Sequence, residues 1–177
     1  MYEDTQEIFD YLPIRQNPPE NEYINHLWQA FTTLDESNEA ARPFAVMPFH
    51  LLFMLSMQYK VLRIANSFPD ACNLFFSGVA GRDKDKLLNS KISVFDIALI
   101  KERTMPEVMS LIGIGPKEII QVKELIDERN DNLAHAKGGI EPDPDGKIQK
   151  YLSDLKMIQF YMLPLNDKIA DNWIVEQ

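Results

Sequence analysis

Polar and ionisable side chains gather in one short stretch of the chain, "ERNDNLAHAKGG", at residues 128–139. If this stretch is helical, residues three apart are neighbours on its surface, so Arg129, Asn132 and His135 form one diagonal ridge. Asp131 lies one turn before His135, where a carboxylate can orient or charge the imidazole ring. A guanidinium offers a fixed fork of donors to phosphate oxygens, and an imidazole titrates near neutral pH. The pattern therefore suits a site that binds an anion and transfers protons.

The segment before this cluster, "EIIQVKELID", has apolar residues at the spacing of a buried helix face. Ile119, Val122 and Ile126 follow one another at intervals of three and four, and Arg129 falls where the next apolar residue is expected. A buried guanidinium is unfavourable unless an anion pairs with it. Two arrangements satisfy Arg129: an ion pair with an acid elsewhere in the chain, or a cleft or subunit interface that receives an anion. A histidine near a helix end, such as His135, also interacts favourably with the last carbonyl groups without any further role.

The elements that must position these residues are helices. The hydrophobic pattern predicts an all-α, single-domain bundle with long antiparallel helices. Helices are expected at about residues 20–36, 48–67, 69–80, 105–112, 116–137 and 147–172. Residues 92–100, "ISVFDIALI", suit either a strand or a short helix. Residues 1–19 are expected to form an N-terminal arm, extended or with a short helix, ahead of a helical domain at 20–177.

Composition narrows the classes of function. The net charge of −9 argues against a protein that coats nucleic acid or an anionic membrane through bulk electrostatics. The most apolar stretch, residues 43–57, is short for a membrane span, and the acidic N-terminus lacks the apolar core of a signal peptide. One cysteine, Cys72, allows no disulfide within the chain, which fits a reducing cytoplasm. We therefore expect a cytoplasmic protein without a membrane anchor, and a buried, inert thiol at Cys72.

Neither a metal site nor an organic cofactor is expected. Three histidines and one cysteine are scattered along the chain, so a zinc site has no support. The glycine-rich loop of nucleotide-binding proteins is also missing from the sequence. His26 and His50 lie in apolar helical segments, and each is expected to be a hydrogen-bonded core or interface residue.

The stretch "RNDNLAH" resembles the signature of HEPN domains, in which an arginine, usually followed by a polar residue, precedes a histidine by four to six residues. Here the gap between Arg129 and His135 is five residues, and Asn130 holds the polar position. The order of a long helix, the motif and a second long helix is also similar. Lys137 stands where some family members carry a tyrosine that a partner nucleotidyltransferase modifies. This departure counts against regulation by such a partner.

The resemblance implies a metal-independent endoribonuclease, of a kind often found in toxin–antitoxin and antiphage systems. Arg129, His135 and Asn130 would be its catalytic residues, with Asn132, Asp131 and Lys137 orienting groups or binding substrate. An RNA 2′-hydroxyl that attacks its neighbouring phosphate needs a base, an acid and positive charge on the phosphorane. A homodimer, as the family's dimeric sites imply, would bring together two histidines and two arginines. The expected partners are RNA, a second copy of the chain, and an antitoxin or regulatory protein.

Two other functions remain open. The first is a HEPN-like module without catalysis, which would use Arg129 and His135 for dimer contacts or nucleotide binding. The second comes from "LIGIGPKEIIQV", residues 111–122, which resembles a DNA-binding helix-hairpin-helix turn. In that reading Gly113 and Gly115 allow a tight hairpin, and Lys117 and the first N–H groups of the next helix bind a DNA phosphate. A plain glycine turn before Pro116 explains the same residues.

Overall fold

The computed structural model describes residues 5–13, 17–79, 94–98, 100–129 and 143–172, and for residues 78–79 and 166–172 the backbone alone. The described residues form helices and short 3-10 turns (η) and contain no strand. The elements are η1 (Glu7–Tyr11), α2 (Pro18–Asp35), η2 (Arg42–Ala45), α3 (Val46–Ser67), α4 (Pro69–Val79), α6 (Val94–Ile97), η4 (Glu102–Thr104), α7 (Met105–Val108), η5 (Met109–Ile112), α8 (Pro116–Arg129) and α9 (Pro144–Asn172). The prediction of an all-α bundle is confirmed. The strand alternative is wrong for residues 94–97, which form α6.

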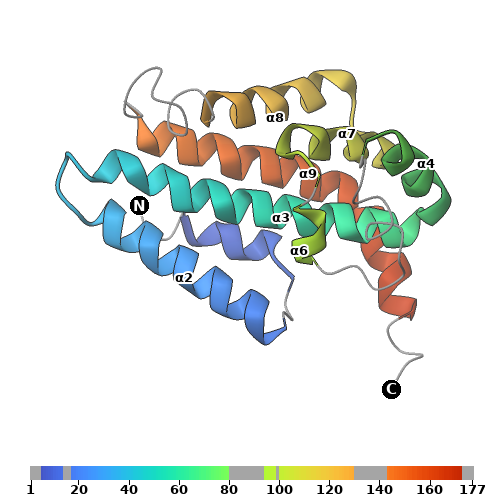
Figure 1. The fold of residues 1–177 in the computed structure, drawn as a ribbon, viewed down its shortest axis with the longest axis horizontal. Helices are drawn as coiled ribbons and strands as arrows, with labels where there is room; N and C mark the ends of the chain where they lie inside the picture. Colours follow the sequence, from blue (N-terminus) through green and yellow to red (C-terminus); the bar gives the residue numbers. More distant parts are fainter. Residues whose placement is uncertain (1–4, 14–16, 80–93, 99, 130–142, 173–177) are drawn as a thin grey trace.

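Helix α3 is the centre of the bundle. It lies between α2 and α9, and α8 packs on α9 (Figure 1). Helices α2 and α3 run antiparallel, as do α8 and α9, whereas α3 and α9 run in the same direction. A helix that is apolar nearly all round belongs in such a position. The C-terminal end of α8 and the N-terminal end of α9 lie side by side (Figure 1).

Aromatic side chains join the three central helices. Phe31 of α2 lies 5.0 Å from Phe49 of α3 between ring centroids, and Phe53 of α3 lies 4.8 Å from Tyr151 of α9. All four rings are fully buried. Offset aromatic pairs of this kind stabilise a core beyond the area they bury. They fix α2, α3 and α9 relative to one another.

Local signals place the helix ends. Asn17 accepts a hydrogen bond from the Glu20 N–H, and the Glu20 side chain accepts one from the Asn17 N–H, so α2 starts with a capping box. Gly113, with φ of +91°, ends η5 in the left-handed region, which glycine adopts without strain. Helix α9 starts at Pro144, where we expected a turn to continue to residue 147. Proline suits the first turn of a helix because that position needs no N–H donor.

The stretch Arg42–Ser67 is long and apolar enough to cross a membrane by length and composition. However, 72% of its most apolar window is buried inside the fold. It therefore serves as the core helix of the bundle.

The N-terminal arm packs against this core. Ile8, Tyr11 and Leu12 belong to the same buried cluster as the helices. Lys60 of α3 is 5% exposed, and its ammonium donates to the Tyr11 carbonyl at 3.1 Å and to Gln159 Oε1 at 3.0 Å. Burial, and to a lesser degree the nearby Arg63, lower the pKa of Lys60 to about 8. A buried ammonium thus holds the arm to α3 and α9.

Lys60 makes the stability of the fold depend on pH. Because its pKa is lower in the folded chain than in the unfolded chain, the unfolded chain binds more protons between about pH 8 and pH 10. We expect the free energy of unfolding to rise by about 2 kcal/mol across this window. Urea titrations should show the rise in the parent and in the control Lys156→Met, whose lysine is exposed. An equal rise in Lys60→Met would contradict this assignment.

Candidate functional site

Arg129 is the last residue of α8, and its guanidinium binds the carboxylate of Glu102 in η4. The Arg129 side chain is 11% exposed and that of Glu102 is 36% exposed. The apolar stripe therefore does carry a largely buried guanidinium, as its pattern indicates. Of the two arrangements expected for it, the structure shows an ion pair with an acid of the same chain.

Further ion pairs attach the segment around η4 to α8. Arg103 Nη2 lies 3.3 Å from Asp127 Oδ2, and the Lys123 ammonium binds the Glu107 carboxylate. The Arg103 side chain is 66% exposed, so its pair adds little stability by itself. The pair between Glu102 and Arg129 is more shielded from water and therefore stronger.

His50 of α3 faces the same carboxylate from the core. It is fully buried, with Nδ1 2.9 Å from the Tyr151 hydroxyl and Nε2 3.8 Å from Glu102 Oε2. The longer distance exceeds that of a hydrogen bond, so the two groups are near neighbours and not a bonded pair. If Tyr151 donates to Nδ1, the remaining ring proton sits on Nε2 and points at Glu102.

Burial sets the charge of these groups. It lowers the pKa of His50, with a smaller contribution from the nearby positive charges of Arg129 and Lys147, and contact with Glu102 opposes the shift. The imidazole is therefore neutral at neutral pH. Contact with His50, followed by the charge of Arg129, lowers the pKa of Glu102 against the effect of its own burial. Glu102 thus remains ionised beside the guanidinium.

Two nitrogen atoms at this site are buried without a hydrogen-bond partner among the described residues. They are Arg129 Nε and His50 Nε2. Buried donors are normally satisfied, so each such group calls for an explanation. The Glu102 carboxylate accepts a hydrogen bond from neither of these two nitrogen atoms.

A second ion pair lies next to this group. The ammonium of Lys147, in α9, binds the carboxylate of Glu128, and Lys147 is 4% exposed. The end of α8 therefore holds two largely buried cations, Arg129 and Lys147, each neutralised by a glutamate that is partly exposed. An anion can bind here where it displaces one of the two glutamates.

The structure places Arg129 but not the other predicted site residues. His135, Asn130, Asp131, Asn132 and Lys137 lie outside the described residues. Within the described ranges, no group of three or more His, Cys, Asp or Glu side chains is placed to hold a metal ion. The resemblance to HEPN domains stays a prediction.

The predictions for His50, Cys72 and His26 can be compared with the structure. His50 is a hydrogen-bonded core residue, and Cys72 is buried with a pKa that burial raises to about 11, both as predicted. A core position is wrong for His26, which is exposed on α2. It falls between the buried Ile24 and Leu27, on the outward side of the helix.

No pattern in the sequence identified Glu102, Tyr151 and Lys147 as parts of this site. Glu102 is 27 residues away from Arg129 along the chain. Tyr151 belongs to the apolar stripe of α9, so the pattern indicates a core residue and nothing about its hydroxyl. An arginine on an apolar stripe indicates that an acid elsewhere in the chain pairs with it. This pattern does not identify which acid.

The turn before α8 bears on the DNA-binding alternative. Gly113 adopts the positive φ that a hairpin requires, and Ile114 is buried beneath it. However, a Cβ at Gly115 would lie 2.7 Å from Glu118 Oε2, so the Glu118 carboxylate occupies the space over the turn. A negative charge at this point repels a phosphate from the first N–H groups of α8.

Comparison of the chain with protein-family models, with curated proteins and with solved structures finds no match to any of them. The function must therefore be inferred from the chain's own residues.

The ion pair at the end of α8 should be a measurable part of the chain's stability. Glu102→Gln leaves a largely buried guanidinium without its counter-charge, so we expect a loss of about 1–2 kcal/mol, less than for a fully buried pair because Glu102 is partly exposed. Asp127→Asn is the matched control, because it breaks the exposed pair between the same two elements and should cost less than about 0.5 kcal/mol. Urea denaturation measures both. Equal losses in the two variants would show that Arg129 is no more dependent on its partner than a surface residue.

Proposed function

We propose that the chain is a metal-independent endoribonuclease of the HEPN type, which acts as a homodimer. The observation that supports this most is the environment of Arg129. It ends a long helix, its buried Nε has no hydrogen-bond partner among the described residues, and it comes directly before the stretch that contains His135. Arg63 also has a buried Nε without a described partner, so the adjoining histidine motif is what distinguishes Arg129.

The proposed reaction is an attack of an RNA 2′-hydroxyl on the neighbouring phosphate. A base takes the hydroxyl proton, the 2′-oxygen bonds to phosphorus, and an acid protonates the departing 5′-oxygen. The products are a 2′,3′-cyclic phosphate and a 5′-hydroxyl. In the proposed site, His135 and its copy in a second chain would carry the protons, and Arg129 would stabilise the charge on the phosphorane. Asn130 would complete the catalytic set, with Asn132, Asp131 and Lys137 orienting groups or binding RNA.

Glu102 has a defined place in this proposal. A phosphate that approaches Arg129 must replace the Glu102 carboxylate or share the guanidinium with it. The fork has donors for both, because Glu102 binds Nη2 and no described residue accepts a hydrogen bond from the buried Nε. Glu102 would therefore orient the guanidinium and also reduce its affinity for arbitrary anions.

The acidic chain suits an enzyme with restricted access to substrate. With a net charge of −9, it repels most of an RNA backbone and would select a short exposed loop. A cytoplasmic toxin or antiphage effector, held in check by an antitoxin or another regulatory partner, is consistent with such selectivity.

A module without catalysis is the first alternative. The pair between Glu102 and Arg129 favours it, because the arginine already has an anion within its own chain. In that case Arg129 and His135 would contribute to a dimer contact or bind a nucleotide without cleaving it.

The catalytic proposal can be tested with one histidine variant and one control. His135→Ala should lower the rate of RNA cleavage at least 100-fold, about the smallest contribution of a general acid or base, without changing helix content or dimer mass. His26→Ala should cleave at the parent rate, because His26 is exposed on α2, and α3 and α9 lie between α2 and α8 (Figure 1). The assay detects cyclic-phosphate ends after incubation with total RNA. Cleavage by His135→Ala at the parent rate, or no cleavage by the parent, would contradict the proposal.

The DNA-binding alternative has its own test. The position of Glu118 leads us to expect no salt-dependent binding of duplex DNA in a filter-binding assay. Binding that falls steeply with salt, and that Lys117→Ala weakens, would favour the helix-hairpin-helix reading over the ribonuclease.

A further inference from the structure

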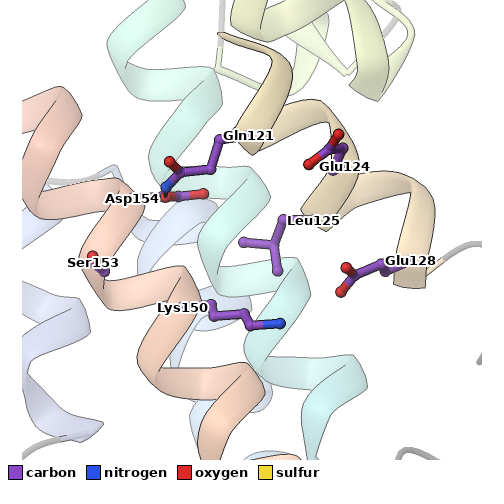
Figure 2. Close-up of a pocket in the computed structure, with 7 residues that line it drawn as sticks. All are labelled: Gln121, Glu124, Leu125, Glu128, Lys150, Ser153 and Asp154. Carbon is purple, nitrogen blue, oxygen red and sulfur yellow. Dashed lines mark hydrogen bonds between the residues drawn. The ribbon is translucent and has the colours of Figure 1, made fainter. Parts of the chain in front are cut away.

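A cleft with a volume of about 300 Å³ lies between α8 and α9 and extends to Glu128, the residue before Arg129 (Figure 2). Its walls combine carboxylates, amide, hydroxyl and ammonium groups with one apolar side chain. The residues that line it are Gln121, Glu124, Leu125, Glu128, Lys150, Ser153 and Asp154. Six of these seven residues are polar or charged, and Leu125 supplies the apolar surface.

Asp154 is the unusual residue of this cleft. It is 2% exposed, and the Gln121 amide donates a hydrogen bond to its Oδ1. Within the described part of the chain, no lysine, arginine or histidine nitrogen lies within 4.0 Å of its carboxylate. Burial raises the pKa of Asp154 to about 6, although the bond from Gln121 acts in the opposite direction. At neutral pH Asp154 is therefore a buried negative charge with no cation beside it among the described residues.

The other charges of the cleft do not neutralise Asp154. Glu128 is already paired with Lys147. The charge of Lys150 also acts on Glu128, so the three carboxylates and two ammonium groups leave one negative charge in excess. Figure 2 shows Asp154 beside Gln121 at one end of the cleft and Lys150 at the other, with Leu125 between them.

We propose that this cleft binds a small organic monocation, a primary amine or a guanidinium on a short aliphatic chain. Its charged group would lie on the Asp154 carboxylate, where it supplies the counter-charge that the protein lacks. Its aliphatic chain would lie on Leu125. The buried position of Asp154 strengthens this ion pair, because little water remains to screen it. The inference does not depend on the proposed ribonuclease activity.

Titration of the full-length, isotope-labelled chain with n-butylamine and n-butylguanidine tests the proposal by NMR. We expect saturable shifts of backbone signals in α8 and α9, and none from butyrate or n-butanol at the same concentrations. Affinity should fall as the pH is lowered through about 6, because Asp154 takes up a proton there. Equal shifts from n-butanol, or no saturation by either cation, would overturn the proposal.

Two variants of opposite effect separate ligand binding from folding. Asp154→Asn keeps an acceptor for Gln121 and removes the charge, so affinity for n-butylamine should fall at least tenfold. Lys150→Met removes the competing cation from an exposed position, so affinity should rise several-fold. Asp70→Asn, at an exposed position on α4, should bind as the parent does. If Lys150→Met and Asp154→Asn both bind like the parent, the carboxylate is not the receptor and the proposal fails.

Discussion

The burial of one guanidinium at the end of α8 constrains this region of the fold. A charge in that position is unfavourable without an anion, and Glu102 provides one from a short 3-10 turn. Because the turn must stay where its carboxylate reaches Arg129, the segment that leads into α7 is held against α8. The neighbouring pairs of Arg103 with Asp127 and of Lys123 with Glu107 follow the same seam.

Four elements meet at this point, and each supplies one group. Helix α3 gives His50, α9 gives Tyr151, η4 gives Glu102 and α8 gives Arg129. The imidazole and the phenol lie in the aromatic core of α3 and α9. The two glutamates nearby are partly exposed. An external anion would have to replace one of these carboxylates to bind a buried cation at this site.

Much of the fold could be predicted from the sequence because apolar periodicity is a local signal. The stripe of Ile119, Val122 and Ile126 also located Arg129 on the buried side of its helix. Periodicity shows which face of a helix is buried, but not which residue pairs with a charge on that face. Glu102 could therefore not be identified from it. The same limit hid Asp154, which lies beside the apolar residues of α9 and is buried with them. The apolar residues around His26 also led to the wrong expectation of a core position, because an apolar helix still has one face toward solvent.

The proposal combines the motif at residues 129–135 with the site formed by Arg129, Glu102 and His50. The imidazole of His50 is fully buried, so it cannot touch RNA, and it can act on a substrate through Glu102 alone. In the proposal, proton transfer to RNA belongs to His135, which the resemblance to HEPN domains singles out. Arg129 would bind the phosphate.

The most direct measurement is the NMR signal of the Arg129 Nε–H group, assigned with Arg129→Lys, during titration with an RNA oligonucleotide that carries 2′-O-methyl groups and cannot be cleaved. We expect this signal to shift in a saturable manner as a phosphate reaches the unsatisfied nitrogen, while the signal of the exposed Arg103 stays in place. If RNA binds and the Arg129 signal does not move, or if no RNA binds at all, Arg129 serves the fold alone and the ribonuclease proposal is wrong.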